Sequence, residues 1–138
     1  MSSPRTAAFA WGPAGLYMAL IWVLSSLSLG PGFARGFPFG DKGVHLLEYG
    51  LLGFLLAHAA GRTWPRRHPL RTASLAWLIA VLWGLFDEIH QAFVPGRASD
   101  VLDLAADACG AALGVGARHL KAVAARLVPA ALRGSGPR

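Results

Sequence analysis

Long stretches without charge constrain the fold of this chain more than any other feature. Residues 7–24 are eighteen consecutive positions without a charged side chain, and residues 73–86 are fourteen more. An α-helix rises 1.5 Å per residue, so about 20 apolar residues cross a hydrocarbon core of about 30 Å. Hydrophobic residues make up 54% of the 138 positions and charged residues only 14%, too few for a small soluble protein to cover such runs. The sequence therefore predicts an all-α integral membrane protein.

Clusters of Gly and Pro divide the chain into four expected helices. We expect these transmembrane helices over about residues 7–29, 42–60, 72–93 and 100–119. A cleaved signal peptide is the alternative for the first run, but no small-residue cleavage site follows it. Residues 1–119 would thus form a four-helix membrane domain, and residues 120–138 a basic cytoplasmic tail that is partly disordered.

The charges are distributed unevenly between the two sides of such a four-helix bundle. Four crossings put both termini on one side, which then holds ten Lys and Arg residues, whereas the other side holds three. All seven Asp and Glu residues fall on the side with fewer bases. The positive-inside rule predicts that both termini are cytoplasmic and that the chain is a multi-pass protein of the bacterial inner (cytoplasmic) membrane. The basic tail would contact anionic lipid of the bilayer, and this segregation of charge argues against nucleic-acid binding.

Polar residues at the acidic side fall on shared helix faces. At 100° per residue, the second helix places Asp41, His45 and Glu48 within an arc of about 60°. The third and fourth helices carry further acids near the same level. We expect a polar pocket that opens to the outer surface and is formed by Asp41, Lys42, His45, Glu48, Tyr49, Asp87, Glu88, His90, Gln91, Arg97, Asp100, Asp103 and Asp107.

Some of these residues have simpler interpretations. Asp41 and Asp100 begin helices and are expected to be N-caps. Glu88 points away from the arc that Asp87 shares with His90, which fits a solvated charge at the rim. Arg97 fits either an interfacial anchor or an ion-pair partner. The deeper acids fit either a binding pocket or a purely structural polar network, and the sequence leaves both open.

The chemistry of the expected pocket is less specific than its location. His45, Glu48, Asp87 and His90 are weak candidates for metal ligands, and the spacing assigns no cofactor. No Gly-x-Ser-x-Gly, His-Glu-x-x-His or P-loop motif is present, so no catalytic residue can be named.

Four short motifs resemble the VanZ-like family of small bacterial membrane proteins. They are Leu24-Ser25-Ser26, Asp41-Lys42-Gly43-Val44-His45, Asp87-Glu88-Ile89-His90-Gln91 with Pro95-Gly96-Arg97, and the Asp100, Asp103, Asp107, Gly110 and Gly114 series. Their order and their positions on the helices span roughly residues 20–117. Asp107 departs from the pattern, where Asn is more usual, and adds a carboxylate.

The resemblance implies a four-helix membrane protein of the cell envelope. The family is named for a protein that gives low-level resistance to teicoplanin, a lipid-tailed glycopeptide antibiotic. We therefore expect a non-enzymatic protein whose pocket binds a cell-wall precursor, another lipid-linked ligand or a glycopeptide. Two alternatives stay open: an integral-membrane enzyme acting on a lipid or glycan headgroup, and a structural or assembly protein of the envelope.

Overall fold

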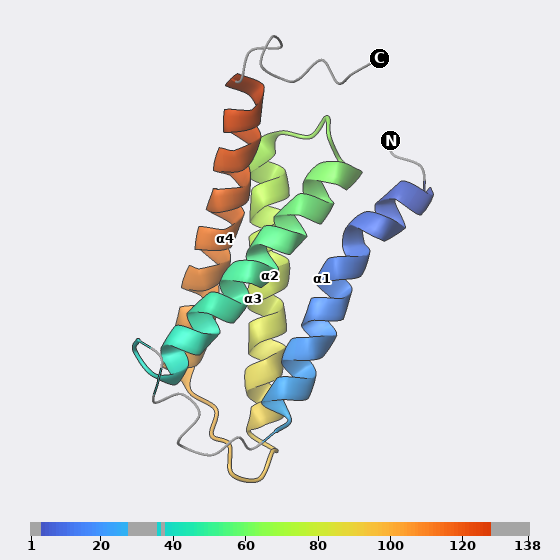
Figure 1. The fold of residues 1–138 in the computed structure, drawn as a ribbon. Helices are drawn as coiled ribbons and strands as arrows, with labels where there is room; N and C mark the ends of the chain where they lie inside the picture. The colour runs from blue at the N-terminus through green and yellow to red at the C-terminus, as the bar shows by residue number, and fades with distance from the viewer. Residues whose placement is uncertain (1–3, 28–35, 37, 128–138) are drawn as a thin grey trace.

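The computed structural model describes residues 4–27, 36 and 38–127, and every described secondary-structure element except isolated turns is helical. The four helices are α1 (Pro4–Ser25), α2 (Asp41–Thr63), α3 (Pro69–Gln91) and α4 (Val101–Leu127). The prediction of four helices is therefore confirmed. The beginning of α1 and the end of α4 lie at one end of the bundle, together with the turn that joins α2 to α3 (Figure 1).

The helix boundaries differ from the expected ones in ways that local chemistry explains. The third helix begins at Pro69, because proline fits the first helical position and the His68 side chain accepts a hydrogen bond from the Leu70 N–H at 3.3 Å. The fourth helix continues to Leu127 instead of ending near residue 119. Residues 120–127 are mostly Leu, Lys, Ala and Arg, which favour helix. The other calls for the tail, and the expected end of the first helix at residue 29, lie outside the described residues.

Small residues hold α2 and α4 in close parallel contact. A Cβ atom added at Gly110 would collide with the backbone of Leu46, and one added at Gly114 would collide with the backbone of Gly50. From the first of these contacts to the second, the residue number rises by four on both helices. The two helices therefore run in the same direction along this contact. Such close approach of backbones is typical of helix pairs in membranes. It places the N-terminal ends of α2 and α4 side by side.

Three of the helices are long and apolar enough to cross a membrane, judged by length and composition. They are the segments Ala8–Ser25, Asp41–Thr63 and Pro69–Gln91. Among the described residues α4 does not meet this criterion, since its first two turns carry Asp103 and Asp107 and its second half carries Arg118 and Lys121. The four crossings predicted from the sequence are thus supported for three helices.

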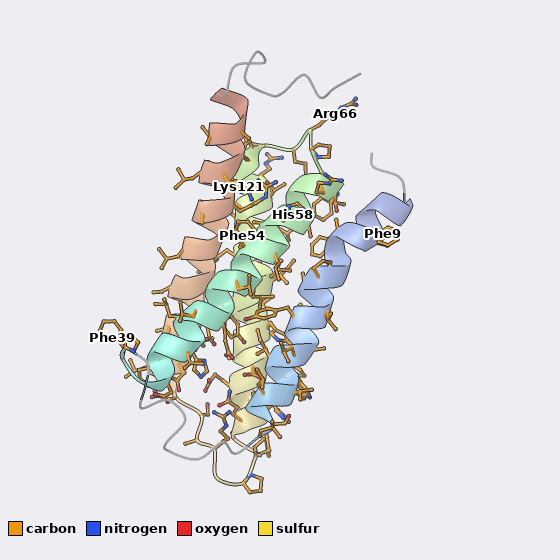
Figure 2. The ribbon with its side chains drawn as sticks, viewed as in Figure 1. Phe9, Phe39, Phe54, His58, Arg66 and Lys121 are labelled. Atoms are coloured by element: carbon orange, nitrogen blue, oxygen red, sulfur yellow. The ribbon has the colours of Figure 1, made fainter. Side chains whose placement is uncertain are left out.

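Most basic residues lie towards the end of the bundle opposite to the acidic residues. His58, Arg66 and Lys121 lie towards the end at which α1 begins (Figure 2). Between the helices, the core consists mainly of small side chains such as Ala76, Ala80 and Ala111, with Leu52 and Leu56. This small-residue core brings the polar faces of α2, α3 and α4 close together at the other end.

Candidate functional site

The candidate site lies at the end of the bundle where α1 and α3 finish and α2 and α4 begin (Figure 1). All of the acidic residues belong to this half of the molecule. The two adjacent helix N-termini carry positive dipole ends, which favour carboxylates nearby. Two buried clusters form there, one centred on Asp87 and one on Asp107. We call them the Asp87 cluster and the Asp107 cluster.

The Asp87 cluster joins the end of α1 to α3. Asp87 is only 2% exposed, and both of its carboxylate oxygens accept hydrogen bonds. Its Oδ1 accepts from the Ser25 hydroxyl at 2.5 Å, and its Oδ2 accepts from the Gln91 amide at 2.8 Å. These three buried side chains satisfy one another and leave no carboxylate oxygen of Asp87 without a partner.

His90 and Arg97 strengthen the same junction. The His90 ring stacks on Trp22 with centroids 3.8 Å apart, and its Nε2 lies 2.9 Å from the Ser26 hydroxyl. Arg97 donates hydrogen bonds at 3.2 Å to the carbonyl oxygens of Leu24 and Leu27. Arg97 is therefore a cap on the last turn of α1, a role that differs from both sequence interpretations.

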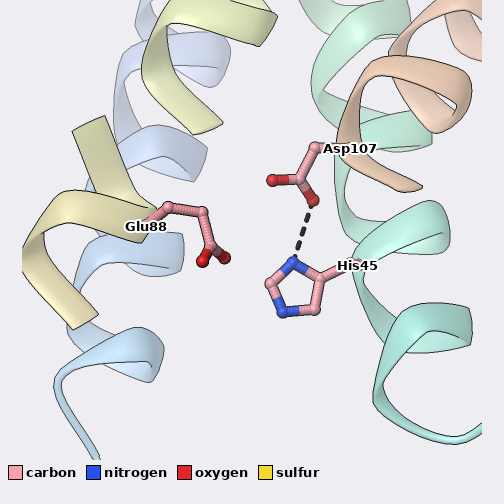
Figure 3. Close-up of side chains that lie close together, drawn as sticks. All are labelled: His45, Glu88 and Asp107. Carbon is pink, nitrogen blue, oxygen red and sulfur yellow. Dashed lines mark hydrogen bonds and ion pairs between the residues drawn. The ribbon is translucent and has the colours of Figure 1, made fainter. Parts of the chain in front are cut away.

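The Asp107 cluster lies between α2, α3 and α4, and its centre is a histidine–aspartate pair. The Nδ1 of His45 is 2.9 Å from Oδ1 of Asp107, and both side chains are buried (Figure 3). Gly84 of α3 makes room for this pair, since a Cβ atom there would lie 2.8 Å from Oδ2 of Asp107 and 3.2 Å from Cε1 of Tyr49. The absence of a side chain at residue 84 therefore lets α3 pack over the Asp107 carboxylate.

Glu88 completes the Asp107 cluster from α3. It is 4% exposed, and its Oε2 accepts a hydrogen bond from the backbone N–H of Asp100 at 2.8 Å. The expectation that Glu88 is a solvated rim charge is wrong. The helical-wheel argument assumed that α3 has one interior face. In the structure, α3 contacts α1, α2 and α4. The face of Glu88 therefore meets α4 while the face of His90 meets α1.

Several polar atoms in the Asp107 cluster have no partner. Among the described residues, four buried side-chain polar atoms make no hydrogen bond, and three of them belong to this cluster: the Tyr49 hydroxyl, Oε1 of Glu88 and Oδ2 of Asp107. Buried polar atoms in native proteins are almost always partnered, by protein, water or a bound group. The Asp107 cluster thus keeps unused hydrogen-bonding or ligating capacity.

A rim of charged residues lies at the start of α2 and α4. The Lys42 ammonium group forms ion pairs with Asp100 at 2.7 Å and with Asp103 at 2.8 Å. Asp100 also caps α4, since its side chain accepts a hydrogen bond from the Leu102 N–H at 2.9 Å. The Lys42 ammonium group and this N–H lower the pKa of Asp100 below its ordinary value.

Asp41 and Glu48 take no part in the two clusters. Asp41 is exposed and accepts only from the neighbouring Lys42 N–H, and the N-cap of α2 is Gly40. Glu48 is half-buried, and no hydrogen bond or ion pair to it is found among the described residues. The expected cap at Asp41 is therefore wrong, whereas the expected cap at Asp100 is observed.

Three residues of the Asp107 cluster could hold a metal ion together. His45, Glu88 and Asp107 each offer one ligand atom, and these atoms lie within 4.8 Å of one another. Of the weak candidates from the sequence, only His45 belongs to this group, because Asp87 and His90 are engaged with α1 and Gln91. Glu88 and Asp107 were expected in the polar pocket but not as metal ligands, because the helical wheel turned Glu88 away from the shared arc and the sequence does not show that Asp107 faces His45.

The fold and the site define an all-helical membrane protein with a buried acidic cluster at one end of its bundle. The sequence matches the VanZ/LLP1 family over residues 17–121. The chain belongs to the VanZ/LLP1 family. Comparisons with curated proteins and with solved structures gave no match.

Proposed function

We propose that the protein is a multi-pass protein of the bacterial cytoplasmic membrane with both termini in the cytoplasm and the acidic end facing outward. The ten-to-three distribution of Lys and Arg supports this orientation through the positive-inside rule. Large apolar side chains on the outside of α4 support a fourth crossing, since Leu113 is 63% exposed and Leu120 is 73% exposed. Exposed leucines of this kind are suited to contact with lipid tails.

We further propose that the acidic end binds an amphiphilic ligand of the cell envelope, either a lipid-linked cell-wall precursor or a lipid-tailed glycopeptide such as teicoplanin. The observation that carries this proposal is the position of exposed large hydrophobic residues beside the charged rim. Phe39, Phe93 and Leu102 are 90%, 81% and 58% exposed. Asp100 of the rim and the neighbouring Glu48 of α2 would hold the polar headgroup through hydrogen bonds, while the lipid tail follows the apolar helix faces.

Resistance of a susceptible bacterium that makes the protein tests this proposal. Dose–response curves would be compared for teicoplanin, which has a lipid tail, and vancomycin, which has none, at matched membrane levels of each variant. The native protein is expected to shift the teicoplanin curve by more than the vancomycin curve. Glu48→Gln is expected to reduce the shift, since it removes a half-buried carboxylate for which no hydrogen bond or ion pair is found among the described residues.

Gly116→Ala is the matched control for this comparison. Gly116 lies near the middle of α4, away from the charged rim, and an added Cβ atom would meet nothing within 4 Å. The variant should therefore shift the teicoplanin curve as the native protein does. A native protein that shifts neither curve would overturn the glycopeptide part of the proposal.

A further inference from the structure

We propose that His45, Glu88 and Asp107 form a binding site for a divalent transition-metal ion. The inference goes beyond the proposed function and does not depend on it. Each residue comes from a different helix, namely α2, α3 and α4, so one ion would tie three helices together. Figure 3 shows the Glu88 carboxylate directed towards the His45 ring, whose Nδ1 lies against Asp107.

The three ligand atoms lie slightly farther apart than the ligands of one bound metal ion. The three ligand atoms lie within 4.8 Å of one another. Ligands of one tetrahedral zinc ion lie roughly 3.4 Å apart at metal–ligand distances of about 2.1 Å. Side-chain rotations that bring the atoms together by an ångström or so would therefore complete the site.

The unpartnered oxygens provide independent support. Oε1 of Glu88 and Oδ2 of Asp107 make no hydrogen bond. Both side chains are at least nine-tenths buried, so bulk solvent does not supply the missing partners. The other oxygen of each carboxylate already has a partner, the Asp100 N–H for Glu88 and the His45 ring for Asp107. One free oxygen on each of two carboxylates is what an ion between them would use.

The charge balance of the cluster also favours a cation. Two carboxylates are buried beside one imidazole, and isolated buried charges are costly unless they are paired or bound to a metal. Lys42 is the nearest fixed cation on α2, but its ammonium group is engaged with Asp100 and Asp103. Glu48 of α2 and Asp87 of α3 add further negative charge near the site. A divalent cation would compensate this charge.

The donor set indicates the class of metal. One imidazole nitrogen and two carboxylate oxygens suit zinc, manganese or iron(II). Calcium and magnesium prefer shells made of oxygen alone. Neighbouring Asp87 would not be a ligand, because both of its oxygens accept hydrogen bonds from Ser25 and Gln91. Asp87→Asn is therefore a matched control that removes a buried carboxylate from the same end of the bundle.

Metal content of the purified full-length chain tests the site directly. The protein in detergent would be stripped with a chelator, dialysed against Zn²⁺ or Mn²⁺, desalted and analysed by inductively coupled plasma mass spectrometry. We expect about one ion per chain for the native protein and for Asp87→Asn. Asp107→Asn and Glu88→Gln should retain less than about a tenth of that amount. Gel filtration and circular dichroism would verify that each variant is folded.

A second measurement covers variants that fail to fold. Zn²⁺ added to the stripped native chain should raise its thermal unfolding midpoint, because an ion that binds only the folded state stabilises it. A native chain that neither retains metal nor gains thermal stability would overturn the site and indicate a polar network that shares protons. Equal metal loss in Asp87→Asn and Asp107→Asn would also overturn it, since binding would then be unspecific. The susceptibility assay uses Glu48→Gln, which is no ligand here, so either proposal can fail alone.

Discussion

Asp87 and Asp107 are two nearly inaccessible aspartates at the same end of the bundle, yet their surroundings differ. Asp87 is 2% exposed and Asp107 is 1% exposed. Both oxygens of Asp87 accept hydrogen bonds from neighbouring side chains, whereas Oδ2 of Asp107 has no partner. Similar burial therefore accompanies opposite degrees of hydrogen-bond satisfaction.

This difference separates a structural cluster from one that is available for binding. The Asp87 cluster fixes the end of α1, a helix that otherwise contacts α3 over only a short length. The Asp107 cluster is surrounded by close helix contacts at Gly84 and Gly110, so it does not need further hydrogen bonds to hold the helices together. Burial alone would not distinguish the two clusters, but the count of partners for each oxygen does.

The largest expected effect is on stability, from Asp87→Ala. Removing this carboxylate leaves the Gln91 amide without its acceptor and leaves the Ser25 hydroxyl only the Trp22 carbonyl oxygen, at 3.0 Å. We expect the free energy of unfolding in detergent to fall by about 2–4 kcal/mol. Asp107→Asn should cost no more than about 1 kcal/mol, because the amide oxygen can still accept from His45 and its nitrogen replaces an oxygen that had no partner. Reversible denaturant unfolding of both variants would measure the difference.

Equal costs for these two variants would contradict the distinction between the clusters. An Asp107→Asn variant that unfolds as readily as Asp87→Ala would show that both clusters are structural. Asp87→Asn and Asp107→Asn, which make the same change at two aspartates of nearly equal burial, would serve as the matched pair.

A smaller effect is expected from Gly84→Ala, which intrudes on the Asp107 cluster alone. The new Cβ atom would lie 2.8 Å from Oδ2 of Asp107, so the carboxylate must move. Crowding of this kind costs about 1–3 kcal/mol, partly offset by the better helix propensity of alanine. We expect a net loss of about 1 kcal/mol in thermal or denaturant unfolding. Gly116→Ala, which meets nothing, should be neutral or slightly stabilising.

A double variant sharpens this prediction. Gly84→Ala should cost less in an Asp107→Ala background, because the oxygen that it crowds is gone. Additive costs in the two backgrounds would mean that residue 84 and Asp107 do not contact each other as described.

The arrangement of the helices was largely predictable, because uncharged runs and Gly-Pro clusters are direct physical signals. The end of α4 was not, since a change from apolar to basic residues does not stop a helix. Lys121 and the alanines around it are good helix formers, and no strong helix breaker occurs before Pro129. The change from apolar to basic residues therefore did not predict where α4 ends.

The grouping of the site residues could be predicted only in part. Wheel geometry put His90 beside Asp87 and turned Glu88 outward, but it cannot say how many neighbours a helix has. The His90 ring stacks on Trp22 of α1, and Glu88 accepts a hydrogen bond from the Asp100 N–H at the start of α4. Gln91 and Asp87 were correctly placed on one face because they are four residues apart on the same helix. Contacts between helices required the structure.

Arg97→Lys should have a modest effect that is confined to the Asp87 side. Arginine reaches the carbonyl oxygen of Leu24 in the last turn of α1 and that of Leu27 just after it with two different nitrogens, and a lysine cannot reproduce that geometry. We expect a loss of about 1 kcal/mol and faster hydrogen exchange at the end of α1. Exchange in the first turn of α4 should not change. The same substitution at exposed Arg66, at the opposite end, should alter neither region.

The smallest expected effect concerns the charged rim outside both clusters. The Lys42 ammonium group and the Leu102 N–H hold the pKa of Asp100 below its ordinary value of 3.8. A carboxyl with a lowered pKa in the folded state stabilises that state above the ordinary pKa, and this contribution disappears as the pH falls through the folded-state pKa.

Asp100→Asn keeps a good N-cap but removes the charge. The native protein should therefore be more stable than the variant near pH 7. The gap between their thermal unfolding midpoints should close as the pH falls below about 4. Thermal midpoints measured across this range would show it, and a gap that widens in acid would mean that Asp100 is not held as an anion by Lys42. The gap should stay small at every pH because Asp100 is partly exposed, so solvent and salt weaken its ion pair.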